Sequence, residues 1–141
     1  MKLKVSRADL WEATVEDKPG GLANRLESLT KTGANLELVL AQRTPELGPG
    51  HGVVFVTLPT TAQQEKKAIG AGFAKTNSLH AVRVEGADAP GIGAKMTRAL
   101  ASAGINLRGL SAAALGKNFV VYFAFDTAAD ANKAVDALKR L

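Results

Sequence analysis

Hydrophobic side chains recur every three or four positions in four stretches of the chain, and this spacing predicts four amphipathic helices. In the first stretch Leu22, Leu26 and Leu29 fall on one side. Pro19 favours a helix start just before them, and Gly33 favours a helix end just after them. The other three stretches show similar spacing or open with a capping-box pattern, and they are Thr61–Phe73, Ile92–Gly104 and Thr127–Leu138.

Continuous apolar runs between these helices predict β-strands. Val53–Leu58 and Phe119–Phe125 are apolar at successive positions, so both faces of each strand should be covered. Each run follows a turn rich in Gly, Pro or Asn, which predicts one β-hairpin in each half of the chain. Further extended segments are expected at residues 12–15, 35–42 and 79–84.

The chain contains an internal repeat with an offset of 71 residues. Asp17-Lys18-Pro19-Gly20 returns as Asp88-Ala89-Pro90-Gly91, and Gly33-x-Asn35-Leu36 returns as Gly104-x-Asn106-Leu107. Nine of the 25 positions from 17 to 41 are identical at this offset. Because Pro-Gly and Gly-x-Asn are turn-forming patterns, general helix composition does not explain the match. The repeat therefore indicates a duplication.

Each copy has the order β-α-β-β-α, which predicts two ferredoxin-like α+β units with antiparallel sheets. The division is expected at residues 1–77 and 78–141. Helices should cover one face of each sheet, and a second sheet or a subunit should cover the other. The fourth strand has little room: residues 73–76 allow only a short one in the first copy, and none follows Leu141. The sheets are expected to stay open or to be completed by the extended N-terminus or another subunit.

Composition excludes several classes of site. There is no cysteine and there are two histidines, which removes disulfides, thiolate sites and a histidine-only zinc site. We predict neither a metal nor a cofactor. The net charge of +5 is spread along the chain and gives little support for nucleic acid. No run approaches the roughly 20 apolar residues that span a bilayer, so a cytoplasmic protein without membrane contact is expected.

The repeated motif resembles the ACT domain: Asp-x-Pro-Gly-x-Leu, a helix, Gly-x-Asn-Leu, a β-hairpin and a second helix. The first copy fits closely. The second departs once, because Gly93 stands where an apolar residue is expected and Ile92 lies one place early. The two copies cover nearly all of the chain, which resembles the small stand-alone tandem ACT proteins. The resemblance implies a regulatory protein that binds a small ligand, usually an amino acid, at interfaces between ACT units.

The motif also suits an amino-acid ligand on physical grounds. Unpaired amides at a helix N-terminus attract a carboxylate. An aspartate at the end of the preceding strand can hold an ammonium, and an asparagine can donate or accept beside it. The candidate ligand-binding residues are Asp17, Gly20, Gly21, Leu22 and Asn35 in the first copy, and Asp88, Gly91, Ile92, Gly93 and Asn106 in the second. The same residues also suit turns, caps and loop amides without any ligand. Since the first copy keeps the fuller motif, it is expected to bind first.

Three other functions compete with this interpretation. Catalysis is disfavoured because His51 and His80 have no partner that the sequence identifies, so we predict no enzyme activity. RNA binding would use exposed aromatic residues with basic neighbours, and the aromatic run at 119–125 has only Lys117. The remaining alternative is an oligomerisation or interaction module that binds no ligand. Either way a homo-oligomer, such as a homodimer, is expected, and the enzyme that it could regulate is not identified.

Overall fold

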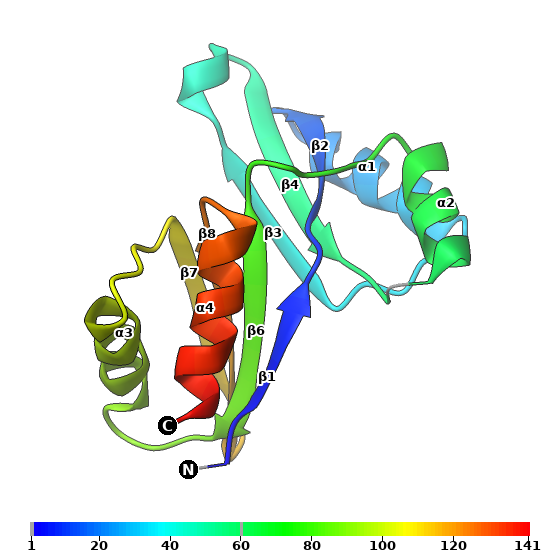
Figure 1. Ribbon diagram of the computed structural model, residues 1–141. Coiled ribbons are helices and arrows are strands. Elements are labelled where there is room, and N and C mark those ends of the chain that lie inside the picture. The colour runs from blue at the N-terminus through cyan, green and yellow to red at the C-terminus, as the bar shows by residue number, and fades with distance from the viewer. Residues whose placement is uncertain (1, 60) are drawn as a thin grey trace. The chain divides into compact units, whose positions relative to one another are not determined.

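The computed structural model describes residues 2–59 and 61–141 and divides the chain into two compact units (Figure 1). The first unit is Asp9–Thr76. The second is Asn77–Leu141 together with the N-terminal segment up to Ala8. The units expected from the sequence, residues 1–77 and 78–141, would place the N-terminal segment in the first unit. In the structure it lies in the second unit, because it forms a strand of that unit's sheet.

The first unit is an antiparallel sheet with two helices. Its sheet has the strand order β3-β4-β2-β5. A short 3-10 turn at Pro45–Leu47 lies in the hairpin between β3 and β4. In chain order the elements are β2 (Trp11–Glu16), α1 (Gly21–Thr30), β3 (Leu38–Arg43), β4 (His51–Thr57), α2 (Ala62–Gly70) and β5 (Ala74–Lys75).

The second unit repeats this plan, with the strand order β1-β6-β8-β7 and antiparallel pairing throughout. Its elements are β1 (Lys4–Ala8), β6 (His80–Ala87), α3 (Ile92–Ser102), β7 (Gly109–Leu115), β8 (Asn118–Phe125) and α4 (Ala128–Lys139). The predicted α+β fold of two ferredoxin-like units with antiparallel sheets is therefore confirmed.

The two units obtain their fourth strand in different ways. In the second unit β1 pairs with β6 over five residue pairs, from Lys4 opposite Glu85 to Ala8 opposite Ala81. In the first unit β5 is two residues long and pairs only with Trp11 and Glu12. The N-terminal segment thus completes one sheet, and the short strand expected near residues 73–76 partly completes the other.

The starts of α2 and α4 follow the capping signals read from the sequence, whereas α1 begins at Gly21, two residues after the Pro19 that was expected to start it. The Thr61 hydroxyl accepts a hydrogen bond from the Gln64 amide at 3.1 Å, and Thr127 accepts one from Asp130 at 3.0 Å. These are the N-cap bonds of α2 and α4. Gly33 and Gly104 have φ values of 80° and 76°, the left-handed conformation that ends a helix most cheaply at glycine.

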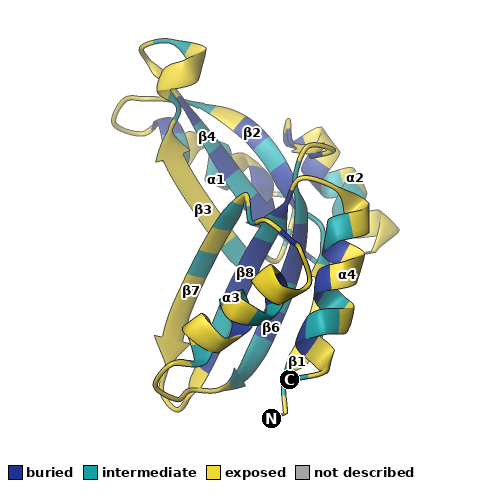
Figure 2. Cartoon of the chain, turned by 60° about the vertical axis from the view of Figure 1, so that its left-hand side comes forward, coloured by how far each residue is buried: buried dark blue, intermediate teal, exposed yellow. Residues whose placement is uncertain are grey.

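Helices cover one face of each sheet, and the two cores lie at these faces. Leu29 and Ala68 pack with Val54 and Val56 in the first unit. In the second unit one side of α4 is buried, visible as dark blue in Figure 2, against alternate residues of β8 such as Phe123. Among the described residues, no helix has the length and apolar character needed to cross a membrane.

Candidate functional site

The loop between β2 and α1 is held in place by backbone hydrogen bonds. The Asp17 amide donates to the Gly50 carbonyl at 3.0 Å, which ties the loop to the β3–β4 hairpin. Gly20 is the N-cap of α1 with a φ of 87°, so glycine is needed there for the backbone alone. Gly21 is required by packing, because a Cβ atom at this position would collide with the Glu16 carbonyl. These contacts fix the first turn of α1 against the end of β2.

The first turn of α1 presents amides that could bind an anion. The Gly21 amide is already used, since it donates to the Lys18 carbonyl at 3.0 Å. Among the described residues, no acceptor bonds to the amides of Leu22 and Ala23. Unpaired amides of this kind are the normal state of a helix N-terminus, and they carry its partial positive charge.

Asp17 is paired with an arginine that sequence reasoning did not single out. The Arg43 Nε atom of β3 lies 2.6 Å from Asp17 Oδ2. Both residues line a hollow of about 200 Å³, whose lining also includes Lys18, Leu22 and Gln42. The Arg43 side chain is 75% exposed and the Asp17 side chain 33%. The pair therefore lies at the rim of the hollow, where it is open to solvent and weak.

The equivalent loop of the second unit has a different character. The Asp88 amide donates to the Lys117 carbonyl at 2.8 Å, as Asp17 does to its own hairpin. A hollow of about 190 Å³ lies here, and side chains such as Met96, Phe119 and Val121 give it an apolar lining. Ala114 stands at the position that corresponds to Arg43. Asp88 consequently has no hydrogen-bonded or ion-paired side-chain partner among the described residues.

The glycines of the second loop leave more room than those of the first. Gly91 is the N-cap of α3 with a φ of 82°. The Ile92 amide donates within the turn to the Ala89 carbonyl at 3.3 Å. A Cβ atom on Gly93 would meet nothing within 4 Å, so this position opens onto space where the first unit has the Leu22 side chain.

Asn35 and Asn106 lie far from the aspartate loops of their own units. Asn35 precedes β3 at the end where Leu38 pairs with Thr57. The backbone amide of Asn35 donates to the Gln64 side chain at 3.3 Å. Asp17 follows β2 at the opposite end, where Glu16 pairs with His51. At about 3.3 Å per residue, a strand of this length separates the two ends by roughly 20 Å. One unit alone therefore does not bring its asparagine and aspartate together, and the repeat implies the same for Asn106 and Asp88.

A charged cluster lies on the face of the second sheet away from the helices. The Arg83 guanidinium donates to the Tyr122 hydroxyl at 3.1 Å and to the Glu85 carboxylate at 2.9 Å. Burial acts to lower the pKa of Arg83, but these two hydrogen bonds outweigh it and raise the pKa overall. The same ion pair lowers the pKa of Glu85. This cluster occupies the hydroxyl of Tyr122, while Phe119, Phe123 and Phe125 are buried in the core and offer no exposed ring for stacking.

A second ion pair, in the first unit, was also missed from the sequence. Lys18 Nζ lies 2.7 Å from Glu16 Oε2. This contact lowers the pKa of Glu16 and raises the pKa of Lys18, first through the hydrogen bond and then through charge attraction. The offset of 71 could have drawn attention to it, because both counterparts, Ala87 and Ala89, are uncharged. Within residues 2–59 and 61–141, no group of three or more His, Asp or Glu side chains could hold a metal ion.

Comparison with known proteins gives structural matches but no sequence matches. No protein-family model matches the chain, and no curated protein matches it. A protein from Bacteroides thetaiotaomicron superposes with a TM-score of 0.76 at 19% identity, covering 96% of this chain and 89% of its own. The ligand-free regulatory subunit of aspartate kinase from Thermus thermophilus gives 0.65 at 18% identity, covering 98% and 95%. Escherichia coli aspartokinase III in complex with aspartate and ADP gives 0.61 at 19% identity, covering 98% of this chain and 32% of that one. At these identities the likeness establishes the fold.

Proposed function

We propose that this chain is a regulatory protein that binds a small amino acid at its two aspartate loops and has no catalytic activity of its own. The observation that carries the proposal is the repeated geometry. Each unit places an aspartate, the first turn of a helix and a hollow of about 190–200 Å³ at the same point of the fold. The match to a regulatory subunit of aspartate kinase supports a regulatory role.

The binding chemistry follows from the groups present. The ligand carboxylate would accept from the amides of Leu22 and Ala23, or of Gly93 and Ala94, at the positive end of the helix. The ligand ammonium would pair with Asp17 or Asp88. Charge-assisted hydrogen bonds of this kind contribute about 1.5–3 kcal/mol each. After the cost of ordering the ligand, two or three of them give dissociation constants from about micromolar to millimolar.

The two loops are not equivalent, and the second is the better site in this proposal. Arg43 already occupies the carboxylate of Asp17, so an incoming ammonium must displace it. No side chain pairs with Asp88 among the described residues, and Ala114 stands where the first unit has the arginine. The apolar lining of the second hollow favours an amino acid with an aliphatic side chain. This order of binding differs from the one that motif completeness alone suggested.

A second copy of the chain would complete each site. Asn35 and Asn106 lie about 20 Å from the aspartates of their own units by strand length, so they can serve a ligand only from a neighbouring unit. The edge strands β3 and β7 each pair with one strand only. Both are largely exposed, and they carry hydrophobic side chains such as Val39 and Leu110 (Figure 2). Edge strands of this kind favour pairing with another chain, so we include a homodimer, in the cytoplasm, in the proposal.

The same exposed edges favour the one alternative that we retain, an oligomerisation module without a ligand. Leu115, at the end of β7, is 80% exposed, and an exposed leucine on an unpaired edge supports assembly whether or not a ligand is present. The two functions differ in what happens when an amino acid is added. A ligand-binding protein is stabilised by it, whereas a pure interaction module is not.

A thermal-shift screen of the twenty amino acids, each at millimolar concentration, tests the proposal. A ligand at 100 times its dissociation constant stabilises the folded protein by about 2.7 kcal/mol, which raises the melting temperature measurably. We expect an aliphatic amino acid to give the largest rise, with Asp88→Ala abolishing it and Asp17→Ala leaving most of it. If no amino acid raises the melting temperature while the protein still self-associates in sedimentation, the interaction module is the better account.

A further inference from the structure

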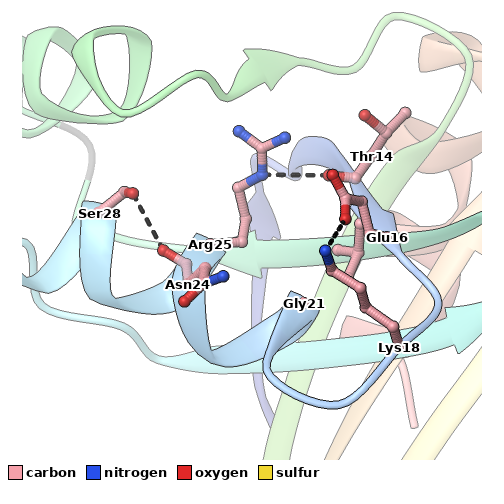
Figure 3. Close-up of a pocket in the computed structure, with 8 residues that line it drawn as sticks. Thr14, Glu16, Lys18, Gly21, Asn24, Arg25 and Ser28 are labelled. Atoms are coloured by element: carbon pink, nitrogen blue, oxygen red, sulfur yellow. Dashed lines mark hydrogen bonds and ion pairs between the residues drawn. The ribbon is translucent and has the colours of Figure 1, made fainter.

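A polar hollow of about 200 Å³ lies along the first unit's β2 and α1, apart from the Asp17 ion pair. It shares Val15, Glu16 and Lys18 with the lining of the Asp17 hollow, but its own lining includes neither Asp17 nor any residue of β3 or β4. Figure 3 shows its side chains, which come from the end of β2, the following loop and the first two turns of α1. They are Thr14, Val15, Glu16, Lys18, Gly21, Asn24, Arg25 and Ser28.

The hollow exists because the fourth strand of this unit is short. In the second unit β1 covers the edge of β6 as far as Glu85, which is the counterpart of Thr14 at the offset of 71. In the first unit β5 begins only at Ala74, opposite Glu12, so no described residue pairs with Thr14 on that side. The Leu10 carbonyl accepts from Thr76 on this same side. Because alternate residues of a strand point their backbone groups the same way, the amide of Thr14 also faces the uncovered edge.

Arg25 reaches this uncovered edge from α1. Its Nε atom donates to the Thr14 carbonyl at 3.1 Å, which holds the guanidinium beside the strand edge (Figure 3). Nη1 lies beside Gly72, where an added Cβ atom would come within 2.9 Å of it, and neither terminal nitrogen has a hydrogen-bond acceptor among the described residues. The counterpart of Arg25 in the second unit is Met96, which is fully buried in that core. The same helix position therefore holds a core methionine in the second unit and a charged arginine, fixed by a hydrogen bond, in the first.

The groups that remain unpaired in the hollow are mainly hydrogen-bond donors. Among the residues that the structure describes, these donors are the Arg25 terminal nitrogens, the Thr14 backbone amide and the side-chain NH2 group of Asn24. Glu16 pairs with Lys18 and is also attracted by Arg25, so these three side chains together carry one positive charge in excess. A planar guanidinium whose outer edge is unpaired matches the two oxygens of a carboxylate.

We propose that this hollow, which we call the Arg25 site, binds a small carboxylate-bearing molecule through Arg25 and without using Asp17 or Asp88. The carboxylate accepts from the two terminal nitrogens of Arg25, and the Thr14 amide donates to a further polar atom of the ligand. The volume holds a molecule about the size of one amino acid or a short dicarboxylate. A ligand here fills the edge that β1 fills in the other unit, and it therefore orders the end of β2 and the loop at Lys18.

An NMR titration of the full-length protein with sodium succinate tests the Arg25 site. The probes are the side-chain Nε–H resonance of Arg25 and the backbone amides of Thr14 and Asn24. We expect these resonances to shift saturably with a dissociation constant in the millimolar range. Succinamide, a neutral analogue, and sodium chloride at matched ionic strength should each leave them unchanged. Equal shifts with sodium chloride, or stronger binding of inorganic phosphate than of succinate, would overturn the assignment to a carboxylate.

Variants separate the Arg25 site from a general charge effect and from the proposed function. Arg25→Met introduces the residue that the second unit uses, so the fold should be kept, and succinate binding should weaken at least tenfold. Arg25→Gln serves as a second variant with a polar side chain and should show the same loss. Arg98→Met removes an exposed arginine of α3 and should change nothing. Asp17→Ala and Asp88→Ala should leave succinate binding intact. Unaltered binding in both Arg25 variants would refute the proposal, whatever the amino-acid screen shows.

Discussion

The two units share one topology, but they differ at the edges of their sheets and at their aspartate loops. The second unit has a fourth strand of five residues, a buried methionine on α3, and an aspartate whose carboxylate has no partner among the described residues, beside an apolar hollow. The first has a fourth strand of two residues, a half-buried arginine at the equivalent position of α1, and an aspartate paired with Arg43. Duplication thus preserved the turns and the core pattern, while charged residues were placed where one unit leaves backbone or space uncovered. Since each difference falls at positions 71 apart, exchanging residues between the units tests its physical meaning.

The largest effect is expected from exchanging Arg25 and Met96. Met96→Arg places a charge in a core position with no exposed surface and no partner, which should cost about 3–5 kcal/mol of unfolding free energy. Arg25→Met should change the free energy of unfolding by less than about 1 kcal/mol, because Arg25 is only half-buried and its side chain is replaced by one of similar length. Urea denaturation of both variants measures the difference. Equal destabilisation would show that the two positions are not distinct environments.

The next effect concerns the two glycines at the start of the helices. Gly21→Ala should cost about 1–3 kcal/mol, because the new methyl group collides with the Glu16 carbonyl and α1 must shift. Gly93→Ala should be neutral or stabilise the protein by up to about 1 kcal/mol, since nothing lies near the added carbon and alanine favours the helix. Thermal unfolding of the two variants provides the comparison. A greater loss in Gly93→Ala than in Gly21→Ala would contradict the packing described for these loops.

A smaller effect is expected on ligand binding when Arg43 and Ala114 are exchanged. An exposed ion pair contributes about 0.2–1 kcal/mol, which corresponds to a change of at most about fivefold in affinity. Arg43→Ala should therefore strengthen amino-acid binding at the first loop by up to that factor, and Ala114→Arg should weaken it at the second. Isothermal titration of the amino acid selected by the thermal-shift screen measures both changes. If Arg43→Ala weakens binding instead, then Arg43 contacts the ligand directly and does not compete with it.

The smallest effect belongs to the Glu16–Lys18 pair, which the second unit lacks. Because Lys18 lowers the pKa of Glu16, the pair stabilises the fold above the unfolded pKa near 4.5, and this contribution is lost as the pH falls through the lower folded value. The raised pKa of Lys18 acts in the opposite direction: its contribution is present below 10.5 and is lost as the pH rises through the higher folded value. Between these limits Lys18→Ala should change the melting temperature only slightly, because both groups are exposed. NMR titration of the Glu16 carboxyl checks the direction, and a pKa above 4.5 would exclude the pair in solution.

Much of the fold could be predicted because its signals are local. Pro-Gly helix starts, Gly-x-Asn ends, the capping threonines and the two apolar hairpin strands are each encoded within a few residues. The role of β1 could not be assigned in this way, because a strand such as Lys4–Ala8 carries no signal for its partner, and here the partner lies more than 70 residues away. The sequence therefore left three possible ways to complete the sheets, and only the structure shows which is used.

The candidate site likewise has parts that the sequence encodes locally and parts that depend on contacts between distant residues. The aspartate loops and helix starts were identifiable from the repeated motif, and the structure places each at the edge of a hollow. The pairing of Asp17 with Arg43 was not, since it joins residues 26 apart with the helix α1 between them in the chain. Nor was Arg25, which the helical pattern treats as a polar position beside Leu26. The proposed role of Arg25 depends on the uncovered edge of β2, and that edge is uncovered because β5 is short.

The most direct test of the central claim, that the aspartate loops bind an amino acid and that the second loop is the open one, is an NMR titration of the labelled protein with leucine. The account predicts saturable shifts of the Gly93 and Ala94 amides, with the Leu22 and Ala23 amides responding only at higher concentration. These shifts should vanish in Asp88→Ala and persist in Asp17→Ala. Saturable shifts that begin at Leu22 and Ala23 would reverse the order of the two sites. The absence of shifts at both loops, with leucine and with every other amino acid, would contradict the account as a whole.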